Sequence, residues 1–212
     1  MEAYLEASLI ERQGGLDGRS TKLPREVVKT PVRQVDPRQE LMDRSILRND
    51  LKIFPFKPDA DGFGECKARV IHVAFCNESG HAVAMVAAGE SVTLEIDLLA
   101  EDVVDNVIVG FYVKNRFGQL LFGDNTVLSQ DGDFSVDEGQ TFRASFRFVM
   151  PRLGSGEYFI TVGVAEGTQE QHVIQQWLHE ALRFVATGGT FSTGLIGIPM
   201  LDVRMGKVTH ES

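Results

Sequence analysis

The chain has 212 residues with 43% hydrophobic side chains, enough to bury the core of one ordinary domain with an appended segment or of two small domains. Its formal net charge is -9, and the excess of acidic residues lies in the part after residue 52, which contains eleven Lys and Arg and twenty-one Asp and Glu. Because a nucleic-acid-binding protein needs a basic face to neutralise phosphates, this charge argues against that class of protein.

Residues 1–53 differ in composition from the rest of the chain. They contain few aromatic residues, mixed charge, and prolines at positions 24, 31 and 37 that interrupt any long periodic pattern. This segment is therefore expected to be a linker, partly helical or disordered, before a folded domain over 54–212. Asp36 followed by Pro37 is a good helix start. The apolar stripe of that expected helix consists of Leu41, Met42 and Ile46.

From residue 63 onward the pattern is typical of β-structure. Turn-rich segments such as NESG (77–80), DGD (131–133) and GSG (154–156) separate short runs of strand-forming residues. About seven short strands with almost no helix signal between them predict an all-β, immunoglobulin-like antiparallel β-sandwich. The expected strands are 68–76, 91–99, 106–114, 119–122, 141–149, 157–165 and 181–187.

The stretch NVIVGFYVKNRFGQLLFGDNT (106–126) indicates a strand, a polar turn and a second strand that ends in polar residues. Apolar residues recur at every second position from Val107 to Val113, so one face of this strand is expected to be buried. Tyr112 then lies on the opposite face.

Two further strands show the same period of two. Along 141–149 three phenylalanines point to one side, while Arg143 and Arg147 point to the other. Along 157–165 the alternation directs Phe159 outward, unless the register slips by one residue.

The end of the chain is unusual for its apolar character. After Gly188 and Gly189 it continues TFSTGLIGIPMLDVRM, a strand-forming stretch that follows an already complete sandwich. An uncovered hydrophobic edge is an aggregation hazard, so this tail is expected to pack on or exchange with a second copy, giving a homodimer.

Motifs of catalysis or metal binding are absent from the sequence. It contains no GxxxxGK[ST] loop for ATP hydrolysis and no HExxH or GxSxG motif, and Cys66 and Cys76 lack the CxxC spacing of zinc sites. It also contains neither a run of about 18 apolar residues nor a secretory signal. The chain is therefore expected to be a soluble protein without cofactor, metal or catalytic residues.

Five stretches occur in an order that is known from one family. They are a glycine-containing opening (62–80), a strand (91–98), a central hairpin (109–126), the turn LGSGEY (153–158) and a closing strand pair (172–185). Together they resemble the C-terminal polysaccharide-binding domain of Wzt, the ATP-binding subunit of bacterial O-antigen exporters. Residues 4–9 also resemble the extreme end of the preceding ATPase domain.

The resemblance implies a cytoplasmic β-sandwich that binds the exported O-antigen polysaccharide, often through its modified non-reducing end, and so selects the substrate of an ABC transporter. It implies the ATPase domain and the membrane subunit as partners, which would hold this chain at the inner membrane. ATPase activity would then lie in a domain absent from the chain. The alternatives are a structural or protein-interaction β-sandwich and a hydrolase with an unrecognised site.

A sugar-binding site needs an exposed aromatic ring against the C–H face of the sugar, with planar polar groups for its hydroxyls. The candidate platforms are Tyr112, Trp177 and Phe159. The candidate polar partners are His72, Arg143, Arg147, Gln175, Asp124 and Asn125.

Several of these candidates have a structural alternative. Trp177 is equally expected as a plug between the two sheets, and Asp124 and Asn125 are expected residues at the end of a hairpin strand. Arg143 and Arg147 lie four residues apart on one strand, about 13 Å, and so fit two surface charges better than one clamp.

Overall fold

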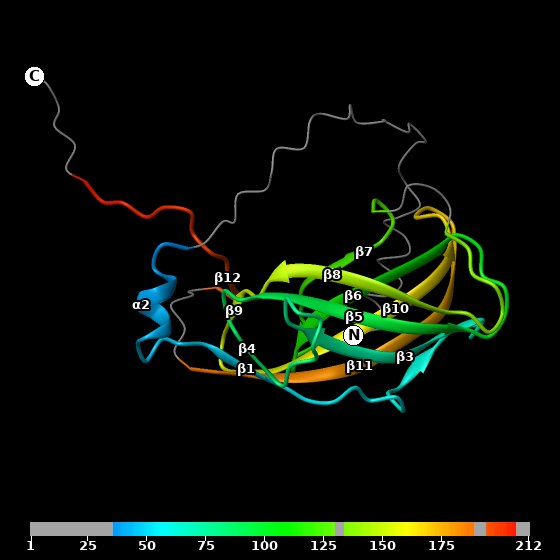
Figure 1. Cartoon of the computed structure of the whole chain (residues 1–212), viewed down its shortest axis with the longest axis horizontal. Coiled ribbons are helices and arrows are strands. Elements are labelled where there is room, and N and C mark those ends of the chain that lie inside the picture. The colour runs from blue at the N-terminus through cyan, green and yellow to red at the C-terminus, as the bar shows by residue number, and fades with distance from the viewer. Residues whose placement is uncertain (1–35, 130–133, 189–193, 207–212) are drawn as a thin grey trace, which may run out of the picture.

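The computed structural model describes residues 36–129, 134–188 and 194–206 (Figure 1). Antiparallel sheets face each other across one core, as predicted. The larger sheet has the strand order β4-β1-β11-β10-β6-β7, with β2 paired to β11. Its strands are β1 (Asp50–Ile53), β2 (Gly62–Phe63), β4 (Met85–Ala87), β6 (Val107–Asn115), β7 (Leu120–Asn125), β10 (Gly156–Gly167) and β11 (His172–Thr187).

The second sheet has the order β3-β5-β8. Its strands are β3 (Ala68–Cys76), β5 (Ser91–Ala100) and β8 (Thr141–Val149). A two-stranded ribbon of β9 (Arg152–Leu153) and β12 (Ile196–Gly197) lies at one end of the sandwich, near the short helix α2 (Gln39–Asp43) (Figure 1).

The core lies between the inner faces of the two sheets, and strict alternation produces it. In β5 every second residue is buried, so that Leu94, Ile96 and Leu98 are fully covered. Val113 of β6 and Ile160 of β10 are likewise fully buried and belong to the same cluster. Each side chain buried in this way stabilises the fold by about 1.5–3 kcal/mol.

Aromatic rings join the two sheets at the centre of this core. The ring of Phe111 on β6 lies 4.9 Å from that of Phe146 and 5.9 Å from that of Phe148, both on β8. The predicted faces of these strands are therefore confirmed, because the phenylalanines of β8 pack inward while Arg143 and Arg147 point outward.

The strand predictions hold where a segment is long enough to show its period. Five expected strands agree with β3, β5, β6, β8 and β10 within two residues at each end. The expected strand 181–187 is instead the second half of β11, so the expected strand pair over 172–185 is one strand. Its pairing with β10 shifts register around Glu180, which has a φ of 54°. Strands β1, β2 and β4 were not predicted, since two to four residues are too few to show alternation.

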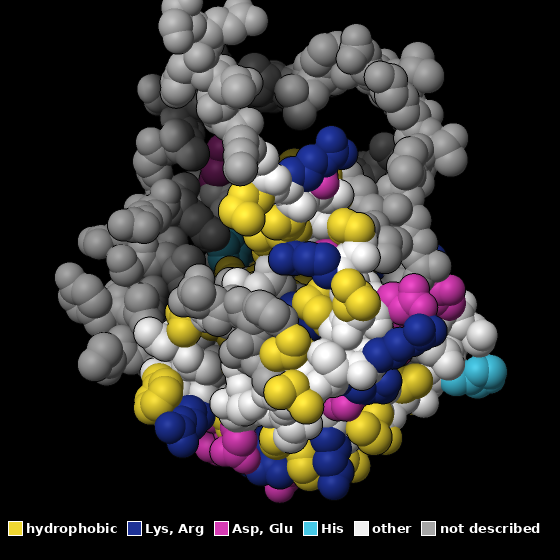
Figure 2. All heavy atoms as spheres, turned by 90° about the vertical axis from the view of Figure 1, so that its left-hand side faces the viewer, with side chains coloured by type: hydrophobic (Ala, Val, Ile, Leu, Met, Phe, Trp, Pro, Cys, Tyr) yellow, Lys and Arg dark blue, Asp and Glu magenta, His cyan; other side chains and the backbone are white. Residues whose placement is uncertain are grey.

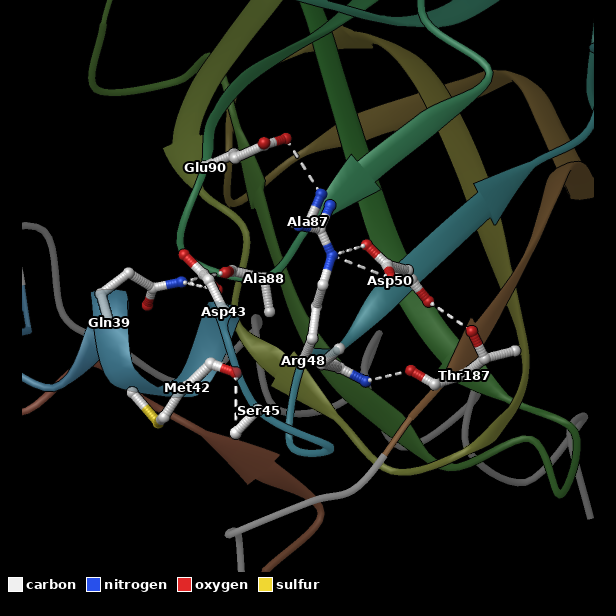
Figure 3. Close-up of polar contacts among 11 residues, drawn as sticks. Gln39, Met42, Asp43, Ser45, Arg48, Asp50, Ala87, Ala88, Glu90 and Thr187 are labelled. Carbon is white, nitrogen blue, oxygen red and sulfur yellow. Dashed lines mark hydrogen bonds and ion pairs between the residues drawn. The ribbon is translucent and has the colours of Figure 1, made fainter.

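Strand β1 and helix α2 lie inside the segment expected to be a linker. Strand β1 pairs with both β11 and β4, so the sandwich includes chain from residue 50. The Gln39 amide donates hydrogen bonds to Asp43 Oδ1 and to the Ala88 carbonyl, each at 2.8 Å (Figure 3). The first bond lies within the helix, and the second ties the helix to the turn that follows β4.

The helix is shorter than its predicted apolar stripe. Met42 is buried, but Leu41 and Ile46 are 73% and 91% exposed. Asp36 accepts hydrogen bonds from the backbone and the guanidinium of Arg38 before the helix begins. A helix of five residues buries one side chain of the three expected.

The described part of the C-terminal tail, 194–206, pairs with the sandwich only briefly, through β12. Figure 2 views the end of the molecule that carries α2 and β12 and shows hydrophobic side chains exposed there among Lys and Arg. The exposed apolar residues of the tail are Leu195, Ile198, Met200, Leu201, Val203 and Met205. Among the described residues, no helix has the length and hydropathy to cross a membrane.

Candidate functional site

A groove of about 330 Å³ opens on the outer face of the larger sheet, the face turned away from the core. Strands β6, β10 and β11 form its floor, β2 and the end of β7 form its sides, and the turn between β10 and β11 lies at one end.

A single row of paired residues explains the shape of this groove. Trp177 pairs with Phe63 on one side and with Gly163 on the other. Gly163 pairs with Gly110, and Gly110 pairs with Asn125. Residues paired side by side point to the same face of a sheet, and neighbouring strands lie about 4.8 Å apart. Two adjacent glycines therefore leave a trough between an aromatic pair and an amide.

The glycines at the floor are in contact with the side chains that border them. A Cβ atom on Gly163 would lie 2.8 Å from Cε3 of Trp177, so the indole occupies the space over this glycine. A Cβ atom on Gly110 would lie 3.1 Å from Cβ of Asn125. Any larger residue at Gly163 would displace the indole or fill the groove.

Three aromatic rings form one wall of the groove. The ring of Trp177 lies 5.9 Å from that of Tyr112 and 6.4 Å from that of Phe63, with which it is stacked. Phe63 is 47% exposed, and Tyr112 and Trp177 are partly exposed. The expected alternation of β6 places Tyr112 on this outer face, and Trp177 lies beside it instead of plugging the core.

Strand β2 brings Phe63 into this wall because glycines flank it. A Cβ atom on Gly62 would come within 2.4 Å of the Trp177 carbonyl oxygen, and one on Gly64 would come even closer to that of Gln175. Only a residue without a side chain lets this short strand approach β11 so closely.

Polar groups lie along the opposite wall and the end of the groove. Asp124 and Asn125, at the end of β7, are exposed, and each accepts one local backbone hydrogen bond. The β10–β11 turn contributes Gln169, Glu170, Gln171 and His172. Nδ1 of His172 lies 3.2 Å from the carbonyl oxygen of Thr168, which can only accept. This tautomer leaves Nε2 of a neutral His172 as an acceptor.

Gln175 does not reach the groove. It is fully buried, where its amide accepts from the Lys67 backbone N–H at 3.1 Å and donates to Glu166 at 3.0 Å. Although burial raises the pKa of Glu166, hydrogen bonds from the Asp105 N–H and the Lys67 ammonium outweigh it and hold that pKa below its ordinary value. These bonds form a structural cluster.

Phe159 points outward, as expected, but into a different hollow. This second hollow, of about 490 Å³, is also lined by Phe56, Glu180 and Arg183. Phe159 lies four residues before Gly163 along β10, and so does not contribute to the aromatic wall.

The remaining candidates lie on β3 and β8, in the other sheet. Arg143 binds the carboxylate of Asp97, and this hydrogen bond raises the pKa of its guanidinium. Arg147 pairs with Glu78 at 2.9 Å. His72 is exposed at a bulge of β3, with its ring 6.1 Å from that of Phe56. The structure thus brings Tyr112, Trp177, Asp124 and Asn125 together at the groove. It places His72, Arg143 and Arg147 on the other sheet, away from the groove.

Several groove residues were not identified from the sequence. Gly110 and Gly163 fall on the outward positions of their strands, so the alternation contained a signal for them. Phe63 and the 169–172 turn carried no such signal. In the described ranges, no group of three or more His, Cys, Asp or Glu residues could hold a metal ion.

Comparison with known proteins identifies the fold. The family model of the Wzt C-terminal domain matches residues 59–198. The crystal structure of the C-terminal domain of Wzt aligns over 71% of this chain and 92% of that chain, with 19% identity and a TM-score of 0.56, which shows a shared fold. A β-glucuronidase of Bacteroides uniformis aligns over 65% of this chain and 16% of that chain, with 11% identity and a TM-score of 0.31. This similarity is too weak to indicate a shared fold. No curated protein matches the chain. Because the family model covers well over half of its length, the chain belongs to the family of Wzt C-terminal domains.

Proposed function

We propose that the groove on the outer face of the larger sheet binds the O-antigen polysaccharide through its modified non-reducing end and so selects the substrate of an ABC transporter. Family membership gives the coarser role, a non-catalytic carbohydrate-binding domain of O-antigen ABC transporters. The observation that carries the proposal is the row Phe63, Trp177, Gly163, Gly110 and Asn125, which sets an aromatic wall opposite an amide across a floor of glycine.

This arrangement meets the two requirements of sugar recognition. The partly exposed rings of Tyr112 and Trp177 offer apolar surface to the C–H face of a sugar. Asp124 and Asn125 offer hydrogen-bond acceptors and donors to its hydroxyls from the other wall. The glycine floor admits the ring between them.

The size of the groove favours the end of a glycan over its interior. Ligand pockets in proteins measure about 300–1,000 Å³, so a groove of about 330 Å³ is at the low end of that range. It accommodates a short terminal segment of a polymer. The β10–β11 turn bounds the groove at one end, where a terminal sugar would stop.

The partners follow from the same proposal. An ATPase domain would precede this chain, with the segment before β1 as the connection, and would carry out nucleotide hydrolysis. The membrane subunit of the transporter would hold both domains at the cytoplasmic side of the inner membrane. The sandwich would supply recognition alone.

The exposed apolar tail supports a homodimer. Its hydrophobic side chains extend beyond β12, and Leu195, Ile198 and Leu201 are each more than half exposed. A second copy that covers them would remove an aggregation-prone surface from water.

Calorimetric titration of the chain with the cognate O-antigen polysaccharide tests the function. Saturable binding without release of reducing sugar is the expected result. Release of reducing sugar would indicate a hydrolase instead. Absence of binding, with a protein partner captured on the same face, would indicate the alternative role of a protein-interaction module.

A further inference from the structure

We infer that the groove selects a terminal sugar carrying an uncharged, apolar substituent, such as an O-methyl group, and rejects one carrying a phosphate. This inference rests on the proposed function, because it specifies the chemistry of the sugar that the same groove would hold.

An apolar strip lies beside the glycine floor. Ile108 pairs with Ala165 across β6 and β10, and Ala165 pairs with Ile174 across β10 and β11. All three side chains line the groove, and Val127 lines it after the end of β7. A substituent that points from the sugar toward this strip meets hydrocarbon from four segments of chain. A methyl group is stabilised there, whereas a charged oxygen loses its water without gaining a hydrogen bond.

The described lining of the groove contains acidic side chains. Asp124 and Glu170 line the groove, and among the described residues no Lys or Arg does. Lys114, the outward residue of β6 that follows Tyr112, is 7% exposed and lies outside the lining. An anionic substituent would therefore meet two carboxylates without a compensating cation, and like charges at close range oppose binding.

His172 also lines the groove, at the β10–β11 turn. Its Nδ1 contacts the carbonyl oxygen of Thr168 at 3.2 Å, so its neutral form presents an acceptor at Nε2. An acceptor suits a sugar hydroxyl and opposes a phosphate oxygen.

A glycan array of matched terminal sugars tests the inference. Each of several common hexose disaccharides would be printed unmodified, O-methylated and O-phosphorylated at its non-reducing end. The O-methylated form is expected to bind about fourfold more tightly than the unmodified form, the gain for one buried CH₂ group. The phosphorylated form is expected to bind more weakly than either.

The outcomes separate this inference from the proposed function. A phosphorylated sugar that binds as tightly as its O-methylated counterpart overturns the inference and leaves the carbohydrate-binding role in place. Binding of none of the sugars, together with none of the cognate polysaccharide, overturns both.

Two variants sharpen the test. Glu170→Gln is expected to reduce the ratio of the affinity for the O-methylated sugar to that for the phosphorylated sugar. In the unmodified protein, about 1 M salt should reduce the same ratio, because the Debye length is then about 3 Å. Ile108→Asn is expected to abolish the gain from the methyl group. Ile71→Asn is the matched control, since Ile71 is an exposed residue of β3 on the other sheet. A preference unchanged by Glu170→Gln and by Ile108→Asn contradicts the inference.

Discussion

The indole of Trp177 lies over Gly163 of the neighbouring strand, so closely that a Cβ atom on the glycine would come within 2.8 Å of its Cε3 atom. These two residues are paired across β10 and β11. The absence of one side chain thus determines where the largest ring of the chain can lie, and with it the shape of the groove.

Gly163→Ala is therefore expected to weaken glycan binding by about tenfold or more, or ~1.4 kcal/mol, because the added methyl group displaces the indole from its place beside the floor. Calorimetric titration measures the loss. Gly154→Ala is the control, since its nearest neighbour would be the Tyr158 hydroxyl at an ordinary 3.6 Å. Equal binding by both variants would show that the position of the indole does not matter.

Removing the rings themselves separates recognition from stability. Tyr112→Ala and Trp177→Ala are expected to abolish measurable binding with a small change in the free energy of unfolding, because both rings are partly exposed. Phe111→Ala, at a neighbouring but buried position, should cost about 3–5 kcal/mol. Chemical denaturation measures the stabilities. A loss at Trp177 as large as that at Phe111 would assign Trp177 to the core.

The contrast between Tyr112 and Gln175 shows what the sequence could predict. Tyr112 follows the unbroken alternation of β6, so its face was predictable. In β11 the alternation breaks, because Val164 pairs with Gln176 while the next residue, Ala165, pairs with Ile174. Gln175 is thus the extra residue of a bulge, and its side chain turns into the protein.

The same limit applies to residues brought together by pairing between distant strands. The sequence marks Trp177 and Asn125 as candidates, but their positions in one row follow from registers that pass through β10 and β6. The register of each pair depends on which side chains meet in the core, and Phe63 enters the row through a strand of two residues. The alternation within one strand predicts neither the register between strands nor the position of Phe63.

Arg143 provides a test of which sheet binds the glycan. Its guanidinium is bound by Asp97 and Glu95 on the outer face of the smaller sheet. Arg143→Ala is expected to leave glycan affinity unchanged and to cost less than about 1 kcal/mol of stability, as is usual for exposed ion pairs. Titration with the polysaccharide measures the affinity, and Arg147→Ala serves as a parallel variant. A tenfold loss in either variant would move the site to the smaller sheet.

Asp36 gives the fold an expected dependence on pH. The side-chain hydrogen bond from Arg38, with backbone bonds from Met200 and Arg38, holds the pKa of this carboxyl well below its usual value. A depressed folded-state pKa contributes stability above the unfolded value of about 3.9, and this contribution is lost as the pH falls through the folded-state pKa. Asp36→Asn should therefore destabilise the protein at pH 7 more than at pH 2–3. Thermal unfolding across this range measures the difference, and a constant difference would contradict it.

The apolar side chains of the tail continue past the two residues that pair with β9, and we expect a second copy of the chain to cover them. Light scattering at micromolar concentration is expected to give about twice the chain mass of 23.4 kDa. Leu195→Asp combined with Ile198→Asp should return the protein to a monomer, since a charge buried in an apolar contact is strongly unfavourable. Leu128→Asp is the matched control, because Leu128 is 94% exposed and lies outside the tail. A monomeric unmodified chain, or a dimer that survives both tail substitutions, would show that these side chains are not covered by a second copy.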